Sequence, residues 1–417
     1  MKRCIKILKR LLWNISQAII SLFRKRDKSI VLFGSWFGKR FADNPRYLFE
    51  YLHENKEKLG LTHVVWVTLN EDICREMNSY GYECYMMHSK ESVYYHKKAG
   101  IHMICNGAEV SAPLSPDIMA KYSVGAKKVN LWHGMGGIKG VNFASREYLK
   151  AKEQHPALCA VNEWLRRRTL YRKLAVFYGG WGDCYYLSTT PFETDIMKKY
   201  FLLPDSRFIE SGFPRNNRSL HLMKREEDAV ASFRGYDKII GYFPTFREDN
   251  SNYVYPLSDK RLRNMLVRNN WLWVEKKHSY DKSEILSDGG DGNILRLDSE
   301  FDLNIIIRDM DLIITDYSSV SWDALYHRLP VVYYMPDYEY YMNQDRGLVL
   351  KPEEFLIGPA TYSTEQLYQT LSAGTGGFDA LLLPNEDDIF KKVWGEEKSC
   401  AEIWDDITAF IGYKDKK

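Results

Sequence analysis

Two histidines follow apolar runs that are typical of strands. His133 comes directly after Val129–Trp132 and opens a glycine-rich turn at 134–140, and His278 comes shortly after Trp271–Val274. Imidazole titrates near neutral pH, so His133 at a strand end can act as a general base, and His278 can stabilise a diphosphate leaving group. The alternative for each is a histidine that only bonds backbone or faces solvent.

A third apolar run passes into small polar residues where a helix should begin. Leu312–Thr315 is followed by Asp316, Tyr317, Ser318 and Ser319. Free backbone N–H groups at a helix start attract phosphate, and the two serine hydroxyls are further donors. Simple N-capping by Asp316 or Ser318 explains the same residues and can coexist with phosphate binding.

Three arginines lie in short turn motifs: Arg215 in Gly212–Asn217, Arg247 in Phe243–Arg247, and Arg346 before Gly347. A guanidinium fork suits phosphate, so three such residues on one cleft indicate a doubly charged ligand. For each arginine alone, a surface salt bridge is an equal alternative.

Several common signatures are missing. The chain has no P-loop, no G-x-G-x-x-G after its first strand, no H-E-x-x-H and no G-x-S-x-G. Its seven cysteines are scattered without a C-x-x-C, which argues against a zinc site or a disulfide scaffold. Asp309–Asp311 resembles a metal-binding D-x-D but precedes its strand, and the glycine-rich loop 287–293 lacks the glutamate of a calcium loop. We expect no metal site.

The 417 residues are enough for two or three domains. Apolar runs alternate with helix-like segments such as Pro45–Leu59 and Lys90–Ala99, which predicts parallel sheets with ligands bound beyond the carboxyl ends of the strands. Because ten strands are too many for one open sheet, we predict two doubly wound α/β domains that meet near 212–220. The predicted strands are Ile30–Phe33, Val64–Val67, Ile101–Cys105, Val129–Trp132, Tyr185–Ser188, Phe208–Ser211, Ile239–Phe243, Trp271–Val274, Leu312–Thr315 and Val331–Tyr334.

The first 28 residues form a basic arm. They hold nine of the 58 Lys/Arg and one of the 55 Asp/Glu, which leaves 49 basic and 54 acidic residues and argues against a nucleic-acid-binding body. The least polar stretch, Leu11–Phe23, is too short to span a bilayer, so we predict an amphipathic helix on an anionic membrane surface. A helix packed on the protein's own body is the alternative. The predicted membrane residues are Lys2, Arg3, Lys6, Lys9, Arg10, Trp13, Arg24, Lys25 and Arg26.

A second basic segment interleaved with aromatic residues runs from Trp164 to Lys173. It can contact a membrane or an anionic acceptor, and it can equally be a solvated helix face.

Taken in order, these motifs resemble the CDP-glycerol glycerophosphotransferase family, the wall teichoic acid primases and polymerases and their capsule relatives. The resemblance covers residues 30 to about 370. The motifs that carry it are Gly38–Pro45, Asn130–Gly134, Gly212–Asn217, Tyr242–Arg247, Lys276–His278, Ile314–Ala324 and Asp345–Gly347.

The resemblance implies a GT-B-like architecture: the arm 1–28, an acceptor domain 29–220, and a CDP-donor domain 221–417 that includes the terminal helices. It implies transfer of a polyol phosphate, with glycerol phosphate favoured by the family, from a CDP-polyol to a lipid-linked saccharide or growing polymer at the cytoplasmic face of the membrane. No cofactor and no metal-binding D-x-D are required, and the resemblance leaves metal dependence open.

The resemblance also assigns roles to residues. His133 is implied as the catalytic base and His278 as the second functional histidine. The implied donor contacts are Thr245, Arg247, Ser318, Ser319 and Asp323, to which we add the loop Arg346. The implied supporting cleft residues are Asn44, Gly134, Arg215 and Asp316.

The chain departs from the family pattern beside both histidines. Met135–Lys139 replaces a Thr-Pro-Leu-Lys-like continuation, and Ser279 stands where proline is usual. These changes bear on the acceptor and the polyol rather than on the reaction class. Two other functions stay open: a GT-B glycosyltransferase that uses a nucleotide sugar, and a non-catalytic scaffold in an envelope-polymer complex.

Overall fold

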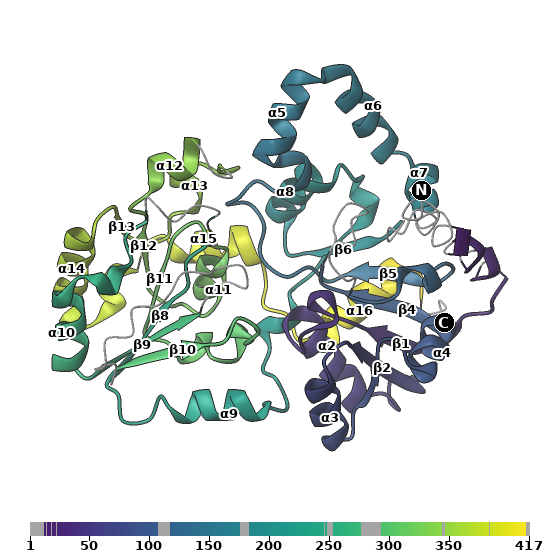
Figure 1. Ribbon diagram of the computed structural model, residues 1–417, viewed down its shortest axis with the longest axis horizontal. Helices are drawn as coiled ribbons and strands as arrows, with labels where there is room; N and C mark the ends of the chain where they lie inside the picture. The colour runs from purple at the N-terminus through teal and green to yellow at the C-terminus, as the bar shows by residue number, and fades with distance from the viewer. Residues whose placement is uncertain are drawn as a thin grey trace, which may run out of the picture.

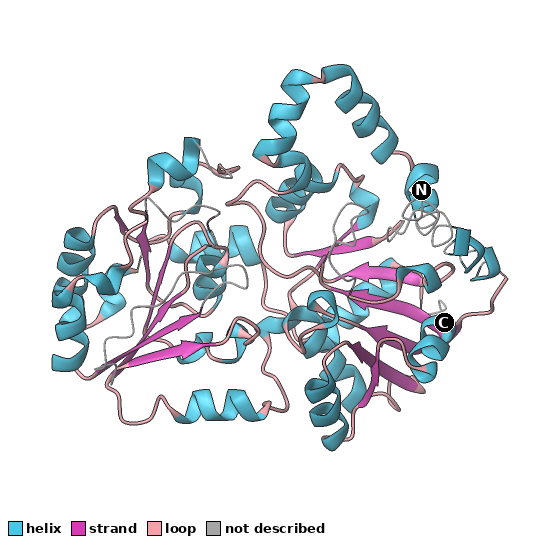
Figure 2. Cartoon of the chain, viewed as in Figure 1, coloured by secondary structure: helices cyan, strands magenta, loops and turns pink. Residues whose placement is uncertain are grey.

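The fold consists of two parallel sheets, each covered by helices (Figures 1 and 2). The computed structural model describes residues 12–13, 15–17, 19–21, 23–106, 117–175, 183–245, 247, 253–276, 293–343, 347–382 and 384–413. The first sheet has seven strands in the order β3-β2-β1-β4-β5-β6-β7, and the second has six in the order β10-β9-β8-β11-β12-β13. The predicted α/β class with two parallel sheets is therefore confirmed.

The first sheet comprises β1 (Asp27–Phe33), β2 (His63–Thr68), β3 (Glu83–Met86), β4 (Ala99–Ile104), β5 (Lys127–Asn130), β6 (Tyr185–Ser188) and β7 (Phe208–Glu210). The helices between its strands are α2 (Asp43–Glu54), α3 (Glu71–Ser79), α4 (Lys90–Lys98) and α8 (Pro191–Phe201). Three more helices, α5 (Arg146–Gln154), α6 (Pro156–Arg166) and α7 (Thr169–Ala175), stand out from the body between β5 and α8 (Figure 1).

The second sheet comprises β8 (Lys238–Tyr242), β9 (Trp271–Lys276), β10 (Ile294–Leu297), β11 (Leu312–Thr315), β12 (Val331–Tyr334) and β13 (Ala360–Thr361). Its helices are α10 (Lys260–Arg268), α11 (Val320–Tyr326), α12 (Tyr338–Asn343), α13 (Pro352–Phe355) and α14 (Thr364–Ala373), and α9 (Lys224–Ala231) precedes β8.

All ten predicted strands are present, and the structure adds β3, β10 and β13. Each added strand lies at an edge of its sheet. An edge strand needs less apolar surface than a central one, and only one residue of β3 and one of β10 are buried. Central strands such as β4 and β11 are buried at every position.

Both sheets place their strands in the order 3-2-1-4-5-6 familiar from dinucleotide-binding folds, so the order reverses between β1 and β4 and between β8 and β11. Ligands of such sheets bind beyond the carboxyl ends of the strands at these reversals. The turns at 34–38, 105–106 and 243–247 and the start of α11 therefore lie where chemistry is expected.

The last described helix packs on the first domain, whereas the prediction placed both terminal helices in the second. Helix α16 (Cys400–Phe410) packs on α2 and β7 of the first sheet, and α15 (Glu386–Trp394) contacts both α8 and α11. The reason is the burial of apolar side chains, because α16 buries Ile403, Trp404 and Ile407 in a core cluster that runs continuously through both domains.

Arg26 is a correction to the predicted membrane set. Its guanidinium donates to the carbonyls of His96 (2.7 Å), Ala99 (3.3 Å), Tyr122 (2.5 Å) and Val124. Four backbone acceptors hold the side chain against α4, β4 and the segment before β5, so it anchors the start of β1 instead of facing lipid. Lys2, Arg3, Lys6, Lys9 and Arg10 lie outside the described residues.

Removing the Trp404 side chain tests the role of α16. Trp404 is fully buried, so Trp404→Ala should lower the free energy of unfolding by about 3–5 kcal/mol because it leaves a cavity between the helix and the first sheet. Urea denaturation followed by fluorescence measures the change. Phe410→Ala, at an exposed position of the same helix, should cost less than about 1 kcal/mol; equal losses would contradict this packing role.

Candidate functional site

His133 is held in a fixed orientation at the carboxyl end of β5. Trp132 adopts a left-handed conformation with φ 59°, which turns the chain sharply after the strand. The buried Asn44 side chain secures this turn by donating to the carbonyls of Leu131 (2.9 Å) and Trp132 (3.1 Å). The imidazole contacts the rings of Trp132 and Trp36, at centroid distances of 4.3 and 5.2 Å.

The hydrogen bond made by the His133 ring determines which ring nitrogen carries the proton. Nδ1 lies 2.9 Å from the backbone carbonyl of Cys105, which can only accept, so Nδ1 carries the proton and Nε2 carries the lone pair. Asp117 fixes that carbonyl by accepting from the N–H groups of Cys105 (3.0 Å) and Asn106 (2.8 Å). An oriented imidazole with Nε2 free of its proton is the arrangement a general base requires.

The surroundings of His133 favour the neutral ring. Burial lowers the pKa of His133 below its ordinary value, and the charges of Arg215 and Lys139 lower it further, while Asp43 and the hydrogen bond to Cys105 oppose the shift. The ring is therefore available as a proton acceptor at neutral pH.

The start of α11 faces His133 from the second domain. Ser318 and Ser319 are half-buried, and a Cβ on Gly134 would lie only 3.0 Å from Oγ of Ser319. Lys139, five residues further along the loop, places Nζ 3.5 Å from Oγ1 of Thr245. The structure thus brings the loop that follows His133 next to Ser319 and Thr245 of the second domain.

Arg215 connects the two domains beneath this cleft. Its guanidinium binds Oδ1 of Asp43 (3.1 Å) at the start of α2, Oδ1 of Asp323 (2.6 Å) in α11, and the carbonyl of His133 (2.9 Å). All three side chains that form the ion pairs are buried. Burial raises the pKa of Asp323 to about 6, opposed by the charge of Arg215.

Asp43 is a site residue that sequence reasoning missed. It has φ 64°, accepts from the indole N–H of Trp36 (3.2 Å), and donates its backbone N–H to Asp302 (3.0 Å) of the second domain. Its place beside Asn44 in the G-K-R-F-A-D-N-P motif was the available signal. Asp117 and Asp302 lie outside any recognisable motif.

Arg247 does not present a free guanidinium to a phosphate. Nε and Nη2 bind the two carboxylate oxygens of Asp337 (2.5 and 3.0 Å), and Nη1 binds Asp316 (2.7 Å) and the carbonyl of Thr245 (2.6 Å). The side chain is buried, so its expected phosphate contact is replaced by a structural role. Asp316 also accepts from the backbone N–H of Thr245 (2.8 Å), which positions the turn after β8.

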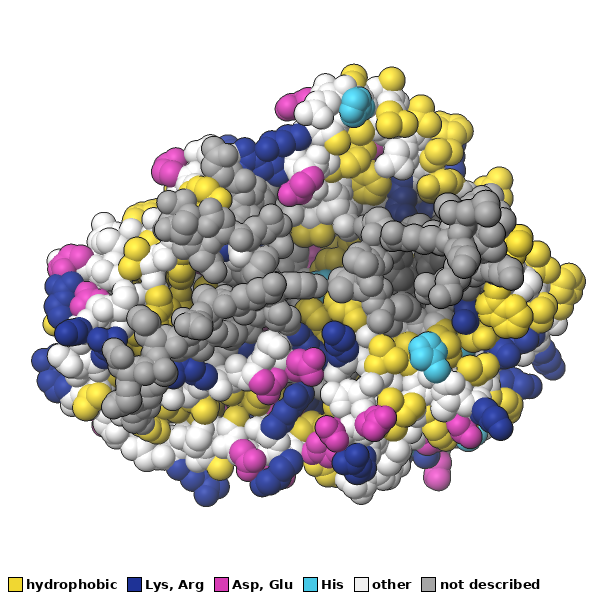
Figure 3. All heavy atoms as spheres, in the orientation of Figure 1, with side chains coloured by type: hydrophobic (Ala, Val, Ile, Leu, Met, Phe, Trp, Pro, Cys, Tyr) yellow, Lys and Arg dark blue, Asp and Glu magenta, His cyan; other side chains and the backbone are white. Residues whose placement is uncertain are grey.

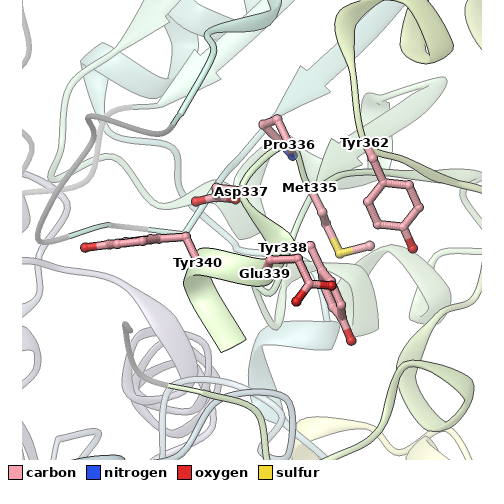
Figure 4. A pocket seen from close by; sticks show the side chains of 7 residues that line it. All are labelled: Met335, Pro336, Asp337, Tyr338, Glu339, Tyr340 and Tyr362. Carbon is pink, nitrogen blue, oxygen red and sulfur yellow. The ribbon is translucent and has the colours of Figure 1, made fainter. Parts of the chain in front are cut away.

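Asp337 also lines a pocket of about 730 Å³ beyond the carboxyl end of β12 (Figure 4). Tyr340 points to one side of this segment, and Tyr338 and Tyr362 lie on the other (Figure 4). The remaining lining residues are Met335, Pro336 and Glu339. The pocket is joined to the candidate site through the ion pair of Asp337 with Arg247.

His278 and Arg346 lie outside the described residues, as does most of the loop 287–293. Asp309 and Asp311 precede β11, as predicted. Asp311 accepts from the backbone N–H of Ile239 (2.7 Å), so it lies at the amino ends of β8 and β11, opposite the carboxyl ends that border the candidate site. Within the described ranges, no group of three or more His, Cys, Asp or Glu side chains is arranged to hold a metal ion.

Comparisons with known proteins identify the family of this chain. Residues 16–377 match the family model for CDP-glycerol:poly(glycerophosphate) glycerophosphotransferase. The teichoic acid poly(glycerol phosphate) polymerase of Bacillus spizizenii is 27% identical, over 86% of this chain and 87% of the relative. The teichoic acid glycerol-phosphate transferase of Staphylococcus aureus is 22% identical, over 83% and 84%.

A solved structure of the wall teichoic acid polymerase TagF superposes with a TM-score of 0.68 at 18% identity, over 100% of this chain and 98% of that one. This likeness supports the fold. The match to the family model covers most of the chain, so the protein belongs to the CDP-glycerol:poly(glycerophosphate) glycerophosphotransferase family and is a transferase of that class.

Replacing Arg215 tests the buried connection between the domains. Arg215→Ala should lower the free energy of unfolding by about 3–5 kcal/mol, because it leaves Asp43 and Asp323 buried without their counter-charge. Chemical denaturation measures this loss. The exposed pair Arg75–Asp72 provides the control, since Arg75→Ala should change stability by less than about 0.5 kcal/mol. Similar effects at both positions would contradict the role given to Arg215.

Proposed function

We propose that this protein transfers glycerol phosphate from CDP-glycerol to a hydroxyl of a lipid-linked saccharide or growing polymer in the synthesis of teichoic acid or a capsule-type envelope polymer. The observation that carries the proposal is the placement of His133, with its proton fixed on Nδ1, opposite the hydroxyl-rich start of α11. Family membership supports CDP-glycerol as the donor.

In this reaction the acceptor oxygen forms a bond to the phosphorus that bears glycerol. The bond from that phosphorus to the bridging oxygen breaks, and the bridging oxygen leaves with its electron pair as part of CMP. Nε2 of His133 takes the hydroxyl proton. Phosphoryl transfer depends mainly on positioning and charge stabilisation, and a well-placed base adds about 10²–10⁴-fold.

The second domain would hold the donor. Ser318, Ser319 and the N–H groups at the start of α11 are suited to the diphosphate. Asp323 lies on the same helix, where its ion pair with Arg215 supports the helix start from beneath, and Thr245 borders the phosphates. The family resemblance implies His278, and the loop pattern Arg346, as further donor contacts.

We also propose that the protein sits peripherally on the cytoplasmic face of an anionic membrane. Among the described residues, no helix is long and apolar enough to cross a bilayer. Helices α5–α7 instead carry exposed apolar side chains, which gather over the projecting part of the molecule (Figure 3). These residues are Leu149, Leu158, Val161, Trp164, Leu170 and Tyr171.

Charge supports a lipid partner for this surface. Exposed basic residues stand beside the apolar ones, and the guanidinium of Arg168 lies 4.6 Å from the centre of the Trp164 ring. The basic arm adds exposed Trp13 and Phe23. Apolar side chains with adjacent cations are the combination that binds anionic lipid surfaces, and such binding would confine the enzyme to the plane of its acceptor.

The donor preference and His133→Gln test the proposed reaction. The wild-type protein, incubated with a lipid-linked acceptor, should release CMP from CDP-glycerol, and UDP- or GDP-sugars should give no turnover. His133→Gln should lower kcat by about 10²–10⁴-fold because it removes the base. Chromatography of CMP measures both results.

The pH profile gives an independent reading of the base. Because the pKa of His133 is lowered, wild-type activity should persist to below pH 6.5 and fall once the ring is protonated. His133→Gln should lack this acid limb. Turnover of a nucleotide sugar, or wild-type activity in the variant, would contradict the proposal.

Membrane binding is tested by sedimentation with vesicles. The double substitution Leu158→Glu with Trp164→Glu, and separately deletion of residues 1–23, which keeps Arg26 and β1, should each reduce binding to vesicles that contain phosphatidylglycerol. Val267→Glu introduces the same charge at an exposed apolar position of α10 and should leave binding unchanged. Undiminished sedimentation of all variants would reject the proposed surface.

A further inference from the structure

Lys139 is distinguished by its exposure within the loop that follows β5. Of residues 131–140, eight are buried, and only His133 and Lys139 are half-exposed. The loop therefore offers the cleft two functional side chains, one imidazole and one ammonium.

The first domain fixes the backbone of this loop through Tyr200 in α8. The Tyr200 hydroxyl donates to the carbonyl of Lys139 (2.6 Å) and accepts from the N–H of Gly137 (2.9 Å). Gly137 has φ 118°, and a Cβ there would lie 2.8 Å from Cδ1 of Ile196. Such close packing requires glycine and leaves the loop little freedom.

The second domain holds the same loop from the other side. The N–H of Val349 donates to the carbonyl of Ile138 (2.9 Å), and Lys139 pairs with Leu348 in an antiparallel bridge. Both domains therefore fix the point from which the Lys139 side chain extends.

The ammonium lies between the base and the donor half of the site. Nζ is 3.5 Å from Oγ1 of Thr245, whose backbone N–H is held by Asp316. The same charge is close enough to His133 to contribute to the lowered pKa of that ring, together with burial and Arg215 and against Asp43.

We propose that Lys139 is a further catalytic residue, whose ammonium binds oxygens of the transferred phosphoryl group from the first-domain side while the start of α11 binds them from the second. This inference rests on the proposed function. The positive charge of Lys139 would stabilise the negative charge that develops as the bond to the bridging oxygen breaks. Arg247, bound to two carboxylates, is not free to supply that charge.

Two neutral variants test the role of Lys139. Lys139→Gln, and Lys139→Met, which keeps the aliphatic chain, should lower kcat by about 10²–10³-fold, the usual effect of losing one transition-state donor. Lys139→Arg should recover part of that loss. The acid limb of the pH profile should move to higher pH in both neutral variants, because a cation near His133 is gone. Lys127→Gln, at the exposed opposite end of β5, is the control and should leave both readings unchanged.

Equilibrium binding tests the contact without turnover. CDP carries the second phosphate that Lys139 is proposed to bind, and CMP lacks it. Calorimetry should show affinity for CDP reduced at least about tenfold in the neutral variants, with affinity for CMP unchanged. Equal losses for both nucleotides, or unchanged binding of both, would overturn the proposal.

The outcomes for the two proposals are separable. Wild-type protein that binds CDP but does not turn over CDP-glycerol would contradict the proposed function and leave the CDP-to-CMP comparison intact as a test of Lys139. Full turnover in a neutral variant would contradict the role of Lys139 while the proposed function stands. Circular dichroism of each variant confirms folding, and Lys139→Met replaces Lys139→Gln if the latter is unfolded.

Discussion

The cleft depends on one buried guanidinium. Arg215 binds Asp43 at the start of α2, Asp323 in α11 and the carbonyl of His133, so a single side chain joins both domains to the backbone of the base. Taking three charges out of water is costly, and the arrangement persists only because each has a partner. Its consequence is positional, because one side chain holds both the backbone of His133 and Asp323 in α11.

Two further groups of residues around Arg215 each position one part of the site. The Cys105 carbonyl, held by Asp117, fixes the tautomer of His133. The Asp316–Arg247–Asp337 group fixes the turn that carries Thr245. Neither supporting group is positioned to react, but each decides where a reacting group stands. Much of the buried charge in this cleft thus orients side chains, which leaves phosphate contact to hydroxyls, backbone N–H groups and Lys139.

Much of this structure was predictable, and the failures share a cause. Apolar runs identified every central strand, because burial on both faces imposes that pattern; β3, β10 and β13 were missed because edge strands need no such run. Gly134 lies next to Ser319, and Lys139 next to Thr245, so the loop that follows β5 in the first sheet comes close to the residues that follow β8 and β11 in the second. The sequence could not show which cations are already bound by other protein groups. One of the two carboxylates that bind Arg247 is 90 residues away, and the carbonyls that bind Arg26 are 70 to 98 residues away.

The position of helix α16 affects how the chain can fold during its own synthesis. It is the last described helix of the chain, yet its apolar face belongs to the first sheet, against α2 and β7. The first domain therefore cannot complete its core until residues 400–410 have been synthesised, although its strands are synthesised much earlier. The seven strands of the first sheet, all complete by residue 210, must therefore wait through the synthesis of the whole second domain for the helix that covers them.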